Sequence, residues 1–172
     1  MKDFNQTVSI VIPAFKAEHS IFRLGNEILK IFSNFKTEIV IVNDCSPDNT
    51  HKECLKLIDE HPKEISYIKL AKNAGEHNAV MAGLKHSRGD WVIIMDDDFQ
   101  NPPEEALKLL NYSLINKFDA VYGDYRQKKH NFFRNTISKI NDISANHILG
   151  KPKGLYLSSF KCLSKSIIQK II

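Results

Sequence analysis

The sequence lacks the features that mark several classes of protein. Its 172 residues hold three cysteines, an odd number without the spacing of a zinc site, which disfavours a disulfide scaffold and suits a reducing cytosol better. No apolar run approaches the ~18 residues needed to cross a bilayer. It has no internal repeat, low-complexity stretch or Pro/Gly-rich linker. We therefore expect residues 1–172 to form a single globular domain.

Negative charge is scarce in the last quarter of the chain. Residues 1–126 carry 15 Lys/Arg against 19 Asp/Glu, whereas residues 127–172 carry 9 Lys/Arg against Asp142 alone. The acidic front half makes nucleic acid a poor partner. The basic segment 127–172 is either an ordinary solvated helical surface or a surface for an anionic acceptor or an anionic membrane.

Short β-branched runs alternate with helix-length amphipathic segments. The predicted strands are Val8–Ile12, Glu38–Val42, Ser66–Leu70, Trp91–Met95 and Ala120–Tyr122, and the predicted helices lie near His19–Phe35, Thr50–His61, Glu76–His86 and Pro103–Asn116. Nearly continuous apolar strands are typical of a mostly parallel sheet with helices on both faces. We therefore expect an open α/β sheet whose ligands bind at the carboxyl ends of the strands.

Three adjacent carboxylates, Asp96, Asp97 and Asp98, follow the fourth predicted strand. They repel one another and need a cation or hydrogen-bond donors nearby. Asp96 and Asp98 leave the strand on the same side, and Gln100 can add a neutral oxygen, a ligand set that suits Mg²⁺ or Mn²⁺. Asp97 would point elsewhere, toward a ribose hydroxyl. Capping of the next helix by Asn101 would explain one polar residue and leave the cluster unexplained.

The other strand ends supply candidate contacts to a nucleotide. Asp44 follows a buried strand and can accept a hydrogen bond from a base N–H. Pro13 ends the first strand, and Phe15 can stack on a base or belong to the core. Glu18 can contact the nucleotide or act as a first-turn helix acid. Gly75 at a helix start can bring backbone N–H groups to a phosphate or a base.

Five segments carry a resemblance to glycosyltransferase family 2. Residues 9–18 are similar to its opening strand and Pro-x-Tyr-Asn-Glu-Glu loop, and residues 43–48 to its Asp-Asp-Gly-Ser-Thr-Asp loop with Asn43 for the first Asp. Residues 73–75 resemble Asn-Phe-Gly, and residues 96–104 closely resemble Asp-Ala-Asp-Leu-Gln-x-Pro-Pro-Glu. Residues 154–161 are similar to a later Asp-x-x-Ser-Gly-Phe-Arg segment, with Leu155 for Asp and Ser159 for Gly.

Within the family the chain looks most like the polyprenol-phosphate sugar transferases, the group of dolichol-phosphate mannose synthase and bactoprenol glucosyltransferases. The resemblance implies a GT-A fold, which is a Rossmann-like nucleotide-diphospho-sugar transferase architecture, a UDP- or GDP-linked sugar donor, Mg²⁺ or Mn²⁺, and inversion at the anomeric carbon. The implied nucleotide-sugar residues are Pro13, Ala14, Phe15, Glu18, Asp44, Asn73, Gly75, Asp96 and Asp97. The implied metal ligands are Asp96, Asp98 and Gln100, and the implied catalytic residues are Asp98 and Arg134.

The nucleophile decides between two acceptors. A sugar hydroxyl needs a general base, whereas a lipid phosphate is already ionised near neutral pH and needs cations to hold it. Past the helix start at Glu104, Lys and Arg outnumber the acids, and Arg134 matches an Arg of the family's acceptor-side helix. We therefore favour a polyprenyl phosphate in cell-envelope glycan synthesis. A glycan hydroxyl acceptor and a nucleotide-sugar-binding domain without turnover remain the alternatives.

Two amphipathic segments bear on where the protein works. Residues 131–149 place apolar side chains at helical spacing beside basic ones, which fits either a helix packed on the sheet or an interfacial helix at a membrane. Residues 165–172 form an amphipathic helical pattern without a cap, and we expect the natural chain to continue beyond them. We expect the protein in the cytoplasm at the inner face of the membrane, and a homo-oligomer is compatible with the sequence.

Overall fold

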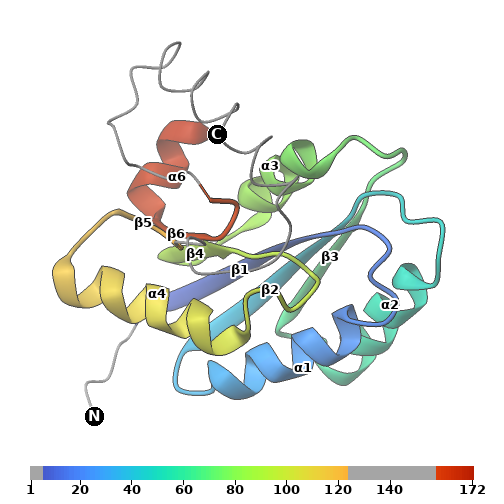
Figure 1. Cartoon of the computed structure of the whole chain (residues 1–172), viewed down its shortest axis with the longest axis horizontal. Coiled ribbons are helices and arrows are strands. Elements are labelled where there is room, and N and C mark those ends of the chain that lie inside the picture. Colours follow the sequence, from blue (N-terminus) through green and yellow to red (C-terminus); the bar gives the residue numbers. More distant parts are fainter. Residues whose placement is uncertain (1–5, 124–157) are drawn as a thin grey trace, which may run out of the picture.

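One six-stranded sheet, in the order β3-β2-β1-β4-β6-β5, organises the computed structural model, which describes residues 6–123 and 158–172 (Figure 1). The strands are β1 (Thr7–Ala14), β2 (Lys36–Asn43), β3 (Ile65–Lys69), β4 (Trp91–Ile94), β5 (Ala120–Tyr122) and β6 (Lys161–Ser164). β1 pairs in parallel with β2 and β4, and β2 pairs in parallel with β3. β6 runs antiparallel to both β4 and β5. The carboxyl ends of β1 to β4 therefore meet at one edge of the sheet.

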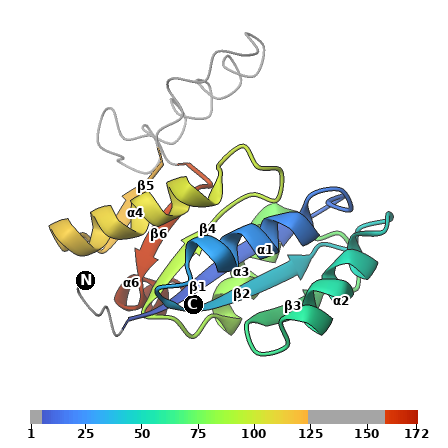
Figure 2. The ribbon, with the colours of Figure 1, turned by 90° about the horizontal axis from the view of Figure 1, so that it is seen from below.

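Helices cover both faces of this sheet (Figures 1 and 2). On one face lie α1 (Ile21–Ile31), α2 (Thr50–Glu60) and α4 (Pro103–Asn116), and on the other lie α3 (Glu76–His86) and α6 (Lys165–Ile171). Along β1, Ile10 and Ile12 pack on the first face and Val11 packs on the second. Because side chains alternate between two buried faces, the central strands must be apolar at nearly every position.

The sequence-based elements agree with the structure over most of the described residues. The five predicted strands are confirmed with ends displaced by at most two residues, and the helix expected at the end of the chain is confirmed as α6. α1 ends at Ile31, earlier than predicted. β6 was not predicted, because Lys161–Ser164 is short and shows no clear apolar alternation. The helix predicted within residues 131–149 lies outside the described residues.

Within residues 6–123 and 158–172, no helix combines the length and the hydropathy needed to span a bilayer.

α3 lies close against the sheet at Gly83. A Cβ atom at Gly83 would lie 2.4 Å from Cγ1 of Val11 and 3.2 Å from Cγ2 of Val42. We expect Gly83→Ala to lower the free energy of unfolding by about 1–3 kcal/mol, because overpacking outweighs alanine's better helix propensity. Urea unfolding measures the change, with the exposed His77→Ala on the same helix as the control. A Gly83→Ala protein as stable as the wild type would contradict this packing.

Candidate active site

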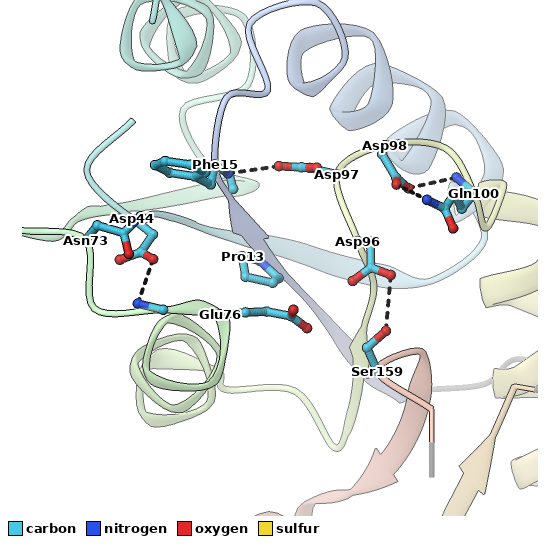
Figure 3. A pocket seen from close by; sticks show the side chains of 12 residues that line it. Pro13, Phe15, Asp44, Asn73, Glu76, Asp96, Asp97, Asp98, Gln100 and Ser159 are labelled. Carbon is cyan, nitrogen blue, oxygen red and sulfur yellow. Dashed lines mark hydrogen bonds between the residues drawn. The ribbon is translucent and has the colours of Figure 1, made fainter. Parts of the chain in front are cut away.

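A cavity of about 500 Å³ opens at the edge of the sheet where β1 to β4 end (Figure 3). Its lining contains most of the predicted site residues together with two further side chains, those of Glu76 and Ser159. The lining residues are Pro13, Ala14, Phe15, Asp44, Asn73, Gly75, Glu76, Asp96, Asp97, Asp98, Gln100 and Ser159. The rule that ligands bind beyond the carboxyl ends of parallel strands therefore located this cavity correctly.

The cavity is strongly acidic. Five carboxylates line it, and the described part of its lining contains no Lys, Arg or His. The pKa of Asp97 is raised to about 6, mainly by burial and also by the negative charges of Asp98 and Asp96, while the hydrogen bond from the Phe15 N–H opposes the shift. Such a site repels a diphosphate unless a cation accompanies it.

Asp97 joins the acid cluster to the loop after β1. Its Oδ2 accepts a hydrogen bond of 3.0 Å from the backbone N–H of Phe15, a residue that is 43% exposed. Asp97 therefore fixes the position of the Phe15 loop and also lines the cavity. Its contact with a ribose hydroxyl stays a prediction.

The predicted metal ligands Asp96, Asp98 and Gln100 lie on the side of the cavity away from Asp44 and Asn73 (Figure 3). Asp98 accepts hydrogen bonds from the backbone N–H of Gln100, at 2.9 Å, and from its side-chain amide, at 2.5 Å. Asp96 Oδ2 accepts a hydrogen bond of 3.1 Å from the Ser159 hydroxyl. No group of three or more His, Cys, Asp or Glu side chains that could hold a metal ion occurs among residues 6–123 and 158–172. A cation here would therefore need ligands beyond the protein's carboxylates.

Asp44 is the most deeply buried of the five acids, with 3% of its surface exposed. Its two carboxylate oxygens accept hydrogen bonds from the backbone N–H groups of Ala74, at 2.7 Å, and Gly75, at 2.9 Å. Gly75 has φ = 87°, a conformation that side chains other than glycine's rarely adopt. Asp44 thus fixes the loop before α3, a role beyond the base contact expected from the sequence.

Left-handed backbone conformations surround the cavity. Lys16, Cys45 and Phe99 have φ of 59°, 55° and 60°, and each directly follows a lining residue. Such conformations cost roughly 1–2 kcal/mol for a residue other than glycine and tend to cluster at functional sites. At Phe99 the packing that compensates includes Arg23 of α1, whose guanidinium carbon lies 4.2 Å from the ring centroid. The contact between Arg23 and Phe99 therefore joins α1 to the loop that carries Asp96, Asp97 and Asp98.

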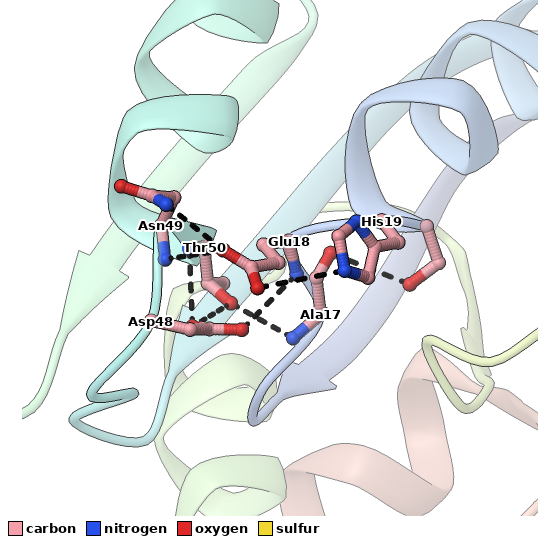
Figure 4. A network of polar contacts seen from close by, with 7 residues as sticks. Ala17, Glu18, His19, Asp48, Asn49 and Thr50 are labelled. Atoms are coloured by element: carbon pink, nitrogen blue, oxygen red, sulfur yellow. Dashed lines mark hydrogen bonds and ion pairs between the residues drawn. The ribbon is translucent and has the colours of Figure 1, made fainter.

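Glu18 is not among the residues that line the cavity, and its polar contacts lie between the starts of α1 and α2 (Figure 4). Its Oε2 accepts hydrogen bonds from the backbone and side-chain N–H groups of Asn49, at 2.9 and 3.0 Å. In return, the Glu18 N–H donates to Asp48, and the Ala17 N–H donates to Thr50 Oγ1. These bonds join the start of α1 to the start of α2, so Glu18 supports the loops from outside the site.

Two lining residues were missed, and one predicted residue cannot be placed. Glu76 follows Gly75 directly, but the sequence argument concerned the backbone N–H groups of that loop. Ser159 was noted only as a departure from the family's glycine. Its contact with Asp96 depends on β6, which was not predicted. Arg134 lies outside the described residues.

The chain matches the sequence profile of glycosyl transferase family 2 over residues 9–172. It is 31% identical over 167 residues to an undecaprenyl-phosphate 4-deoxy-4-formamido-L-arabinose transferase of Proteus mirabilis, covering 96% of this chain and 50% of that protein. The corresponding protein of Salmonella choleraesuis is 30% identical over 167 residues, covering 96% of this chain and 51% of that protein. The chain thus spans about half the length of these curated relatives.

Solved structures show the same fold at lower sequence identity. A mannosyltransferase from Pyrobaculum calidifontis, in complex with GDP-Man and Mn²⁺, aligns with a TM-score of 0.70 at 16% identity, covering 98% of this chain and 47% of that one. Glucosyl-3-phosphoglycerate synthase from Mycobacterium tuberculosis, in complex with Mn²⁺, UDP and glucosyl-3-phosphoglycerate, aligns with a TM-score of 0.72 at 17% identity. The alignment covers 94% of this chain and 58% of that one. The chain has the GT-A fold and belongs to glycosyl transferase family 2.

Proposed function

We propose that the chain is the catalytic part of an inverting, metal-dependent glycosyltransferase that moves a sugar from a UDP- or GDP-linked donor to a polyprenyl phosphate. The observation that carries this proposal is the acidic cavity at the carboxyl edge of the sheet. It has the size of a small-molecule site, and a diphosphate can enter it only with a cation. Membership of the family supports the same reaction class.

The side chains of Asp96, Asp98 and Gln100, which form the proposed metal wall of the cavity, fit Mg²⁺ or Mn²⁺. Asp96 and Asp98 offer carboxylate oxygens, and Gln100 offers an amide that already contacts Asp98 and can turn its oxygen toward an ion. Two carboxylates leave coordination positions for phosphate oxygens and water, which suits a site that binds its metal together with the donor. When bound, the ion would neutralise the charge that develops on the diphosphate leaving group.

The opposite end of the cavity suits the nucleotide. The exposed ring of Phe15 is available for stacking on a base, and the hydrogen bond from its N–H to Asp97 fixes the loop that carries it. Asp44 and Asn73 lie together at this end (Figure 3). Each Asp44 oxygen can accept a second hydrogen bond besides the one from the α3 loop, so a base N–H remains within its capacity.

The relatives' names support a lipid phosphate as acceptor. Two curated relatives at 30–31% identity are named undecaprenyl-phosphate sugar transferases. An ionised phosphate attacks without a general base, so the protein's task is to hold and orient it, and we assign Arg134 to that task. Such an acceptor lies in a membrane, and we place the enzyme in the cytoplasm at its inner face.

Transfer of labelled sugar tests the proposal. The full chain is incubated with Mn²⁺, undecaprenyl phosphate in detergent, and radiolabelled UDP-glucose or GDP-mannose. We expect label to enter the organic phase as a mild-acid-labile lipid-linked sugar, and EDTA to abolish the transfer. Label found only as free sugar, or on an added glycan acceptor, would contradict the assigned acceptor.

A further inference from the structure

Glu76 is a carboxylate in the cavity to which the proposed function gives no task. It is the first residue of α3, and its side chain extends across the cavity toward Asp96 and Ser159 (Figure 3). The other four carboxylates of the cavity accept hydrogen bonds from the chain itself, as described above. Among residues 6–123 and 158–172, none donates a hydrogen bond to Glu76. The carboxylate oxygens of Glu76 are therefore available to accept hydrogen bonds from a ligand in the cavity.

The position of Glu76 within the cavity indicates which part of a donor it would meet. Phe15, Asp44 and Asn73 form one end, and Glu76 points away from them toward the Asp96 wall (Figure 3). With the base at the first end and the diphosphate beside Asp96 and Asp98, Glu76 lies where the transferred sugar begins. A carboxylate repels phosphate, so hydroxyl and amino groups of the sugar are its complementary partners.

The positive charge of Lys161 in β6 interacts electrostatically with Glu76. Partial burial lowers the pKa of the Lys161 ammonium group, and the negative charge of Glu76 opposes that shift. The ammonium nitrogen also lies 5.8 Å from the centroid of the Tyr122 ring, within range of a cation–π interaction. Lys161 therefore compensates part of the charge of Glu76 without forming a hydrogen bond or ion pair with it, and Glu76 remains exposed.

A simpler role for Glu76 is favourable interaction with the helix dipole in the first turn of α3. That role needs no cavity. Glu104 has it in α4, since it is an exposed first-turn acid that does not line the cavity. The two glutamates therefore form a matched pair for separating the helix-dipole role from contact with a ligand.

We propose that Glu76 selects the transferred sugar, accepting hydrogen bonds from a neutral or amino sugar and repelling a donor whose sugar carries a carboxylate. This inference rests on the proposed function, because it assumes that a nucleotide sugar occupies the cavity. It adds to that function the chemical class of the sugar: hydroxyl-rich or amino sugars are accepted, and uronic acids are rejected.

Titration calorimetry in the presence of Mn²⁺ tests the inference on the wild type, Glu76→Gln, Glu76→Ala and the control Glu104→Gln. The probes are UDP with UDP-glucose and UDP-glucuronate, or GDP with GDP-mannose and GDP-mannuronate, whichever nucleotide the wild type binds more tightly. The decisive quantity is the affinity for the neutral nucleotide sugar relative to that for the bare nucleotide. We expect both Glu76 variants to lower this ratio about tenfold, and Glu76→Gln to raise the relative affinity for the uronate donor by a similar factor.

Each other outcome overturns the inference in a recognisable way. Equal weakening of nucleotide and nucleotide sugar would place Glu76 against the nucleotide. Ratios unchanged in both Glu76 variants, as in Glu104→Gln, would leave Glu76 a first-turn helix acid. If Glu76→Gln binds the neutral nucleotide sugar less tightly but still rejects the uronate donor, the negative charge of Glu76 is not what excludes uronic acids. A wild type that binds no nucleotide with Mn²⁺ would contradict the proposed function itself.

Discussion

Replacing Asp98 by asparagine is expected to weaken Mn²⁺-dependent binding of UDP or GDP by about tenfold or more, since each decade of affinity corresponds to ~1.4 kcal/mol. Asp98 is one of two carboxylates on the proposed metal wall, and its exposed side chain faces the cavity. The substitution keeps the size of the side chain and removes its negative charge. A neutral amide is a weaker ligand for a hard divalent cation than a carboxylate is.

The control for this change is Asp59→Asn on the exposed face of α2, which alters the net charge equally and lies outside the cavity. Calorimetry with Mn²⁺ and again with EDTA separates the metal-dependent part of the binding. Unchanged nucleotide affinity in Asp98→Asn would exclude Asp98 from the metal site.

Asp44→Ala is expected to lower the free energy of unfolding by about 3 kcal/mol and to abolish nucleotide binding. Hydrogen bonds to a charged group contribute about 1.5–3 kcal/mol each, and the substitution removes the acceptors of both the Ala74 and the Gly75 N–H. Because Asp44 is buried, water replaces these acceptors poorly. The loop before α3 then loses its fixed position beside the cavity.

A graded series of variants sharpens the Asp44 prediction. Asp44→Asn keeps one oxygen acceptor but turns an amide nitrogen toward the second N–H, so its stability in urea unfolding should fall between those of wild type and Asp44→Ala. If Asp44→Ala unfolds at the wild-type urea concentration, the two hydrogen bonds do not hold the loop.

The strand-end residues could be predicted because their positions follow from periodicity alone. Asp96, Asp44 and the Pro13–Phe15 loop each follow a buried parallel strand, and parallel strands bring such ends to one edge. Hydrogen-bond partners could not be predicted in the same way. The bonds of Asp97 to the Phe15 loop and of Glu18 to Asn49 depend on how loops turn, which hydrophobic periodicity does not encode.

The last strand was missed for a related reason. β6 is short and antiparallel, and it lies between β4 and β5 rather than at the end of a β-α repeat. Its pairing with β4 places Ser159 against Asp96 and brings Lys161 within electrostatic range of Glu76. The sequence therefore predicted the residues that the first four strands bring to the cavity, while Ser159 and Lys161 required the three-dimensional structure.

A crystal structure of the chain grown with Mn²⁺ and UDP or GDP tests the central claim most directly. Data collected near the manganese absorption edge locate the ion without reference to the surrounding protein. Our account predicts an anomalous peak against the Asp96 and Asp98 carboxylates, shared with the diphosphate, and a base beside Phe15 and Asp44. A nucleotide bound elsewhere, or a manganese ion coordinated without Asp96 and Asp98, would contradict it.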